Sequence, residues 1–150
     1  MSTGGFERGT DGPRVIMAGT DGSDTGRRAL AYAAGLARRQ GSRLVVAFVA
    51  PSSAGTAGWL PGADAAVVSA GEEIDAELRP LVEMLAETLH IAAEYRLLRG
   101  DAATELTRLA DALPADAVVV GSSTQAGHRV VGSVAVRLVR AGHWPVTVVP

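Results

Sequence analysis

The sequence predicts a single α/β domain with a five-stranded parallel sheet and helices on both faces. Five short apolar segments alternate with four segments of helical periodicity, in the order βαβαβαβαβ. The apolar segments show little alternation of polar and apolar residues, which is typical of strands covered on both faces. Strands that alternate with helices imply parallel pairing through right-handed crossovers. The length of 150 residues fits one domain.

The first strand and helix have clear ends. Arg14–Gly19 is an apolar run that finishes in the turn sequence Thr20-Asp21-Gly22-Ser23. From Ser23 to about Gln40 the period becomes helical, with Leu and Ala on one face and Arg elsewhere. Ser23 or Asp24 can cap this helix, and Gly41 follows it where a C-cap glycine belongs.

The second strand leads into a long connection. Arg43–Ala50 is apolar without alternation, and Pro51 to about Ala70 is rich in Gly, Ala, Ser and Pro. A connection of this length is often functional or mobile. Helical spacing returns over Glu72–His90, and Pro80 inside this segment predicts a kink or a break.

The third strand, Ala92–Leu98, is more polar than the others, which favours a place near a sheet edge. Asp101 is a good N-cap for the helix that follows, whose apolar face includes Leu106 and Leu113. The fourth strand, Ala115–Val120, is the most apolar of the five.

The last part of the chain contains a glycine-rich segment, Gly121 to Ser133, between the fourth strand and the final helix. This helix is expected over about Val134–Ala141, and Gly142 ends it. The fifth strand, Pro145–Val149, closes the chain. Residues 1–12 are polar and glycine-rich and are expected to form a disordered tail, which leaves residues 13–150 as the domain.

Composition excludes several kinds of chemistry. All 14 basic residues are Arg, so the Lys of a Walker-A phosphate loop and the amine of a Schiff base are absent. The chain has no Cys, which excludes disulfides, thiol nucleophiles and cysteine-bound metal centres. Three dispersed His residues do not suggest a metal site, and no Ser/His/Asp set suggests a catalytic centre. We therefore expect no metal and no enzymatic activity beyond, at most, slow ATP hydrolysis.

Charge and hydropathy bear on partners and location. The net charge is −2 and the basic residues are scattered, so we expect no nucleic-acid partner. No apolar run approaches the roughly 18–20 residues that a membrane-spanning helix needs. The N-terminus lacks the apolar core of a signal peptide. These features predict a soluble cytoplasmic protein without a membrane partner.

Two loops at the carboxyl ends of strands have the character of a ligand site. One is Gly19–Ser23 after the first strand, and the other is Gly121–Ser133 after the fourth. Open α/β sheets bind ligands at this edge, where the strand order reverses. Glycines let the backbone approach a phosphate, and helix N-terminal N–H groups with serine hydroxyls favour negative charge. The alternative is an ordinary strand-to-helix loop with Ser133 as the N-cap.

The sequence resembles the universal stress protein family over nearly its whole length, from Arg14 to Pro150. The resemblance rests on RVIMAGTDGSDTGRRALAYAAGLA at the start, RGDAATELTRLADALPADAVVVGSS in the second half, and GSVAVRLVRAGHWPVTVVP at the end. Asp-Gly-Ser after the first strand, Gly-Asp before the third helix and Gly-Ser-Val before the fourth stand in the family's order. Several signatures in register are far more specific than any one of them.

The resemblance implies a Rossmann-like sheet, similar to the adenine nucleotide alpha hydrolases, with strand order 3-2-1-4-5. It also implies a homodimer through the C-terminal strand and, in one subgroup, an ATP site, with Mg²⁺ as a possible companion. Asp21 would then meet the adenosine end and the backbone of Val49 the adenine. Ribose and phosphates would lie among Gly121, Gly132, Ser133 and Val134. With neighbouring loop positions, the expected site is Thr20, Asp21, Val49, Gly121, Ser122, Gly127, Arg129, Gly132, Ser133 and Val134.

This sequence departs from the family's ATP-binding pattern, which is similar to G-x2-G-x9-G-[ST]. Thr124 takes the second glycine position, and only seven residues separate it from Gly132, so the loop is two residues shorter. Gly127 lies midway in this loop, and Arg129 offers a charge-assisted contact to a phosphate or is a solvated surface residue. His128 is likewise either a ligand contact or a surface residue.

Other readings of single residues stay open at this point. Asp21 can instead stabilise its own turn, and Val49 can simply be core. Trp59 can cover a base or pack at a dimer contact, or it can be an isolated exposed aromatic. Two functions remain: an ATP-binding dimeric stress-response module, or a dimeric interaction module without a nucleotide.

Overall fold

The computed structural model describes residues 12–52, 62–123 and 131–150. Five parallel strands form one sheet in the order β3-β2-β1-β4-β5, as predicted. The strands are β1 (Val15–Thr20), β2 (Arg43–Ala50), β3 (Ala93–Arg99), β4 (Ala117–Gly121) and β5 (Val146–Val149). The helices are α1 (Asp24–Gln40), α2 (Ala63–Leu89), α3 (Ala102–Ala112) and α4 (Ser133–Ala141).

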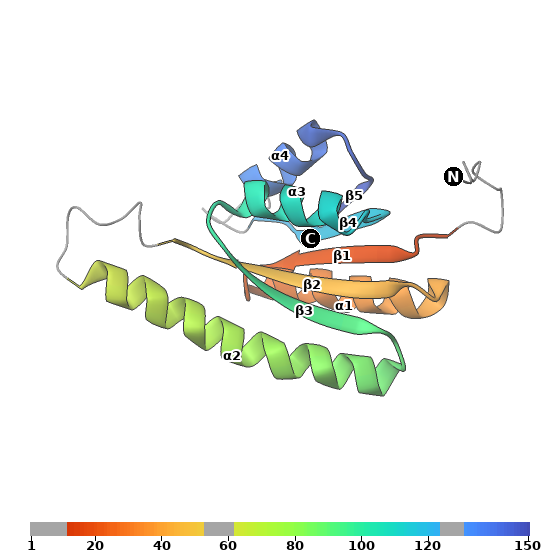
Figure 1. Ribbon diagram of the computed structural model, residues 1–150, viewed down its shortest axis with the longest axis horizontal. Helices are drawn as coiled ribbons and strands as arrows, with labels where there is room; N and C mark the ends of the chain where they lie inside the picture. The colour runs from red at the N-terminus through yellow and green to blue at the C-terminus, as the bar shows by residue number, and fades with distance from the viewer. Residues whose placement is uncertain (1–11, 53–61, 124–130) are drawn as a thin grey trace.

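The sheet separates two apolar cores. Figure 1 shows α1 and α2 on one side of the sheet and α3 and α4 on the other. Alternate residues of the central strands serve the two sides, because successive strand side chains point to opposite faces. Ile16 and Val119 pack towards α1, whereas Met17 and Val118 pack towards α3 and α4. The absence of alternation in the sequence is thus explained by burial on both faces.

The caps of α1 and α3 agree with the sequence. Ser23 is the N-cap of α1, and its Oγ accepts a hydrogen bond from the Gly26 N–H. Gly41 ends that helix in the left-handed region, with φ of 66°. Asp101 is the N-cap of α3 and accepts the Thr104 N–H at 3.0 Å. Each of these residues satisfies a backbone group that a helix end leaves without a partner.

The expected start of α2 is wrong, and so is the expectation of a break at Pro80. The helix begins at Ala63, within the segment expected to be a loop, because Gly62 adopts φ of 89° and the Ala-rich residues after it favour helix. The helix also runs through Pro80 without the break that proline suggested. Pro80 is exposed, so the carbonyl that loses its helical partner can be hydrated.

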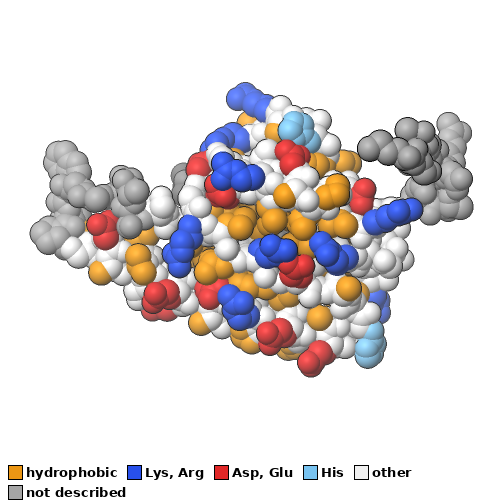
Figure 2. Space-filling view, viewed as in Figure 1, with side chains coloured by type: hydrophobic (Ala, Val, Ile, Leu, Met, Phe, Trp, Pro, Cys, Tyr) orange, Lys and Arg blue, Asp and Glu red, His pale blue; other side chains and the backbone are white. Residues whose placement is uncertain are grey.

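The two edges of the sheet differ in charge. β3 forms one edge, as its polar sequence predicted, and its Glu94 pairs with Arg96 and with Arg43 of β2. Figure 2 shows acidic and basic side chains close together around an apolar centre on this face of the molecule. β5 forms the other edge, and its sequence Val-Thr-Val-Val carries no charge.

Candidate functional site

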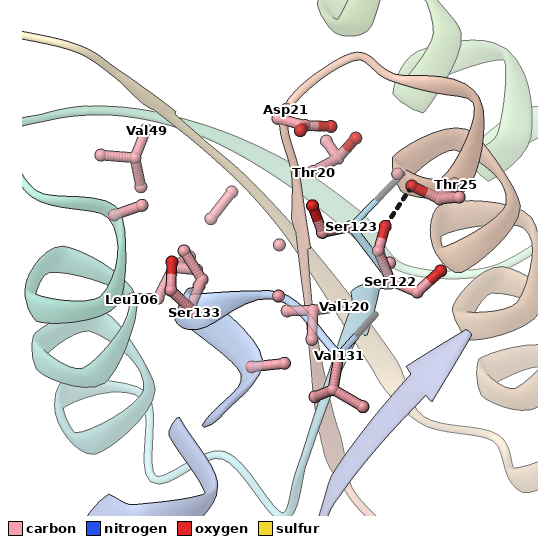
Figure 3. A pocket seen from close by; sticks show the side chains of 18 residues that line it. Thr20, Asp21, Thr25, Val49, Leu106, Val120, Ser122, Ser123, Val131 and Ser133 are labelled. Carbon is pink, nitrogen blue, oxygen red and sulfur yellow. Dashed lines mark hydrogen bonds between the residues drawn. The ribbon is translucent and has the colours of Figure 1, made fainter. Parts of the chain in front are cut away.

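A pocket of about 520 Å³ opens at the carboxyl ends of β1 and β4. These two strands are neighbours at the point where the strand order across the sheet reverses. The volume of the pocket falls within the range of about 300–1,000 Å³ that is usual for small-molecule sites. Figure 3 shows side chains from β1, β2, β4 and the first turns of α1, α3 and α4 around it. Three helix N-termini therefore border one cavity, an arrangement that favours an anionic ligand.

The structure brings most of the predicted site residues to this pocket. Gly127 and Arg129 lie outside the described residues, as do Thr124, His128 and Trp59. The predicted residues that line the pocket are Thr20, Asp21, Val49, Gly121, Ser122, Gly132, Ser133 and Val134.

The loop after β1 is held by its own side chains. The Asp21 carboxylate accepts hydrogen bonds from the Ser23 N–H, at 2.9 Å, and from the Ser23 hydroxyl. Thr20 Oγ1 accepts the Gly22 N–H at 3.2 Å. The turn-stabilising role of Asp21 is therefore real, and Asp21 lines the pocket as well. The two roles are compatible because a carboxylate has several acceptor positions.

Gly121 is required by the fold before any ligand is considered. A Cβ at this position would lie 2.6 Å from the carbonyl carbon of Thr25, in the first turn of α1. Thr25 Oγ1 donates a hydrogen bond of 2.7 Å to the Ser122 carbonyl oxygen, which joins the same two segments. Figure 3 shows this bond beside the pocket. The end of β4 and the start of α1 thus form one wall.

Ser122 supplies a polar group that the protein itself does not use. Its Oγ is buried and has no hydrogen-bond partner among the described residues. A buried hydroxyl without a partner costs about 1–3 kcal/mol, so such groups are uncommon. Because Ser122 lines the pocket, a polar ligand group could satisfy it.

The start of α4 offers backbone donors. Gly132, not Ser133, is the N-cap, and no side chain caps this helix end. The first N–H groups of a helix lack intrahelical partners, so those of Ser133, Val134 and Ala135 remain available at the pocket. A Cβ on Gly132 would lie 3.1 Å from Cβ of Ser123, so the helix start and the end of β4 approach closely here.

Val49 reaches the pocket because β2 is longer than β1 at this end. The β1–β2 pairing stops at Thr20 opposite Phe48. The Ala50 carbonyl oxygen accepts the Gly100 N–H on the β3 side, so the Val49 carbonyl points to the β1 side by strand alternation. If the β1–β2 pairing continued, the Gly22 N–H would donate to the Val49 carbonyl. It donates to Thr20 Oγ1 instead. The Val49 carbonyl therefore points past the end of β1, towards the pocket.

Sequence reasoning did not identify the residues that complete the walls. Thr25 and Gly26 come from the first turn of α1, and Ala102 comes from the first turn of α3. The N-cap Asp101 was the available signal for the third helix N-terminus, because it fixes where α3 begins. Gly19, Ser123 and Val131 also line the pocket and belong to the two predicted loops, although they were not named as site residues. The other unpredicted lining residues are Ala47, Leu106, Val120 and Ala135.

The described ranges lack a metal-binding cluster and a membrane-spanning helix. No three His, Asp or Glu side chains come together there as metal ligands would. No described helix is both long enough and apolar enough to cross a membrane.

Comparisons with known proteins agree with this fold. Residues 13–150 match the model of the Universal stress protein family. Universal stress protein UspA from Lactobacillus plantarum aligns with a TM-score of 0.77 at 22% identity, over 93% of this chain and 100% of its own, and at that identity supports the fold alone. A universal stress family protein from Burkholderia pseudomallei aligns with a TM-score of 0.67 at 27% identity, over 91% and 96%.

A further similar structure holds a ligand. A universal stress protein in complex with cAMP aligns with a TM-score of 0.61 at 25% identity, over 93% of this chain and 98% of its own. A search of curated proteins by sequence gives no match.

Proposed function

The chain belongs to the universal stress protein family, and we propose that its pocket binds an adenine nucleotide, ATP in the first instance, as part of a stress-response signalling module. The observation that carries the proposal is the pairing of two features in one cavity. A helix N-terminus without a side-chain cap stands beside the Ser122 hydroxyl, which has no partner among the described residues, and the Val49 carbonyl is directed past the end of β1. The first suits phosphate, and the second suits the amino group of a base.

The adenine would lie against the end of β2. The exocyclic amine of adenine is a hydrogen-bond donor, and the Val49 carbonyl is an acceptor directed past the end of β1. Ala47, Val49 and Leu106 give this part of the pocket an apolar lining suited to a flat ring. Asp21 would accept a hydrogen bond from the ribose or base edge, with its turn already held by Ser23.

The phosphates would lie at the start of α4. The N–H groups of Ser133, Val134 and Ala135 and the helix dipole favour negative charge there. The Ser122 and Ser133 hydroxyls add donors, and Gly132 keeps the approach to the backbone open. Mg²⁺ would arrive with ATP, since the described part of the chain presents no cluster of metal ligands of its own.

We infer that the protein acts through occupancy rather than catalysis. The chain has no Lys to neutralise charge on a transferred phosphoryl group. Of the acidic residues, only Asp21 lines the pocket in the described ranges, and its carboxylate is engaged by Ser23. Hydrolysis would therefore be slow, and the bound and free forms would be the two signalling states.

We further infer that β5 forms the contact of a homodimer. β5 pairs with β4 on one side and is the last strand of the sheet on the other. It carries no charged side chain, whereas the opposite edge has the Glu94–Arg96 pair. Charged residues protect an edge from pairing, so the uncharged edge is the one suited to a second copy.

The alternative function is a dimeric interaction module without a nucleotide. It is favoured by the loop after β4, which is two residues shorter than the family's ATP-binding pattern. In that case the Ser122 hydroxyl would have no ligand partner and the start of α4 would face water.

Calorimetric titration with ATP–Mg²⁺ separates the two functions. The protein would first be unfolded and refolded to remove any carried-over nucleotide. We expect saturable heat with one site per chain and a rise in melting temperature with ATP concentration. The absence of both at millimolar ATP would reject nucleotide binding and leave the interaction module. Parallel titrations with cAMP and AMP would identify the preferred nucleotide.

A further inference from the structure

Two helices that border the pocket are joined by an ion pair between the N-cap of α3 and the middle of α4. Arg137 of α4 donates from Nη1 to Asp101 Oδ1 at 2.9 Å, and its Nη2 lies 2.8 Å from Asp101 Oδ2. The contact is therefore bidentate, with both guanidinium nitrogens on one carboxylate. Arg137 Nη2 also donates to Thr104 Oγ1 at 3.2 Å.

The carboxylate in this pair is itself fixed. Asp101 is the N-cap of α3, and its Oδ2 accepts the Thr104 N–H at 3.0 Å and the Thr104 hydroxyl at 2.6 Å. Arg137 thus binds a carboxylate, that of Asp101, whose position is set by the first turn of α3. Although both side chains are about half exposed, the bidentate geometry fixes direction as well as distance.

The pair is close in the chain to the two helix starts that line the pocket. Asp101 directly precedes Ala102, the first α3 residue at the pocket wall, and Arg137 is one turn beyond Ser133. Figure 1 shows α3 and α4 side by side on the same face of the sheet. A bond between them sets where the first turn of α4 lies relative to the rest of the cavity.

α4 is otherwise held mainly by apolar packing. It has nine residues, no side-chain cap at its N-terminus, two buried side chains, Ala135 and Leu138, and the partly buried Val134 against the same core. Apolar packing resists separation, but it resists sliding or rotation less well than a directional bond does. The N–H groups proposed to bind phosphate belong to the first turn of this short helix. Their direction therefore depends on what fixes the position of the helix.

We propose that Arg137 is a positioning residue for the phosphate end of the nucleotide, acting through Asp101 to hold the start of α4 against α3. This inference rests on the proposed function of the pocket and adds a residue that does not line it. The role predicts a specific defect. Loss of the pair weakens binding of the phosphates and leaves adenine and ribose binding almost unchanged.

The test compares ATP with adenosine in four variants. Arg137→Met keeps the length of the side chain and removes the ion pair. Asp101→Asn removes the charge and keeps a good N-cap for α3. The double variant closes a cycle, and Arg140→Met is the matched control on the same helix, with the same change in charge.

We expect Arg137→Met to lower ATP affinity by about five- to tenfold and to leave adenosine affinity within about twofold of the wild type. Asp101→Asn should lower ATP affinity as well, and the double variant should be no worse than Arg137→Met. Arg140→Met should bind both ligands as the wild type does. Amide hydrogen exchange of the free protein should increase at 133–136 in the variants that lose the pair and should stay unchanged in Arg140→Met.

Three results would overturn the positioning role. One is an equal loss for ATP and adenosine, which would indicate general destabilisation. Another is unchanged or tighter ATP binding by Asp101→Asn, which would mean that Arg137 acts on phosphate directly. The third is the same loss in Arg140→Met. Failure of the wild type to bind either ligand would instead reject the proposed function, and the positioning role with it.

Discussion

Gly121 at the end of β4 meets Thr25 of α1 so closely that a Cβ atom would stand 2.6 Å from the Thr25 carbonyl carbon. The same pair of segments is joined by the hydrogen bond from Thr25 Oγ1 to the Ser122 carbonyl. Backbone occupies the space, so no side-chain rotation can relieve a substitution. The contacts that pack the start of α1 against β4 therefore also form one wall of the pocket.

Gly121→Ala should destabilise the fold by about 1–3 kcal/mol, because the added methyl group must push α1 away from β4. Denaturant unfolding would measure this change. Gly35→Ala is the control, since a Cβ there meets nothing within 4 Å. That control should be stabilising by about 0.5–1 kcal/mol, as expected for alanine in a helix. Equal effects in the two variants would show that the close approach is not real.

Asp21→Ala should weaken ATP and adenosine together, by about tenfold, since the carboxylate serves the adenosine end and holds its own turn. The measurement is calorimetric titration with both ligands. Asp24→Ala is the control, because Asp24 carries the same charge in the same region and does not line the pocket. An effect on ATP alone would place Asp21 at the phosphate end and contradict the assignment.

Val148→Pro should leave the protein monomeric if the proposed dimer forms through β5. Pro145 and Val149 direct their carbonyl oxygens to β4, so strand alternation directs the Val148 N–H to the outer edge. Proline removes that donor without removing a bond to β4, as is tolerated on edge strands. Sedimentation would measure the mass, with Val148→Ala as the control that loses packing and keeps the N–H. A dimeric Val148→Pro variant would exclude β5 backbone pairing.

The contribution of the Arg137–Asp101 pair to stability should disappear in acid. Hydrogen bonds from Arg137 and then from Thr104 hold the pKa of Asp101 well below its ordinary value of 3.8. A lowered pKa in the folded state adds stability above the ordinary value, and this stability is lost as pH falls through the lowered one. The melting temperatures of the wild type and Arg137→Met should therefore differ most above about pH 5 and converge towards pH 2. A constant difference across this range would show that the ionised pair contributes nothing.

The parallel sheet could be predicted because each strand is a short apolar run bounded by turn residues, whereas the strand order followed from the resemblance to the family. Capping residues such as Ser23 and Asp101 bond to backbone groups only three positions away. The helix starts that they mark can therefore be predicted from the local sequence. The start of α2 was missed because 63–70 has many small residues and no apolar face. These residues are mostly exposed, so the helix there needs no core to pack on.

Part of the candidate site could likewise be predicted from the sequence, and part could not. The residues that come directly after strands, such as Asp21 and Gly121, follow from the rule for parallel sheets. The contacts that shape the pocket do not, because they join distant positions. Thr25 and Ser122 are 97 residues apart, and Arg137 and Asp101 are 36 apart. Nothing in the local sequence marks these partners, and only the folded chain brings them together.

The unequal edges of the sheet also limit how large an assembly can become. Growth into a filament needs two adhesive surfaces on each chain, one to join the copy before and one to join the copy after. The ion pairs of Glu94 with Arg96 and Arg43 make the β3 edge unsuitable as a second surface. Two chains that pair through β5 would use the one uncharged edge that each has. Association would then stop at two, and the protein could become abundant without polymerising.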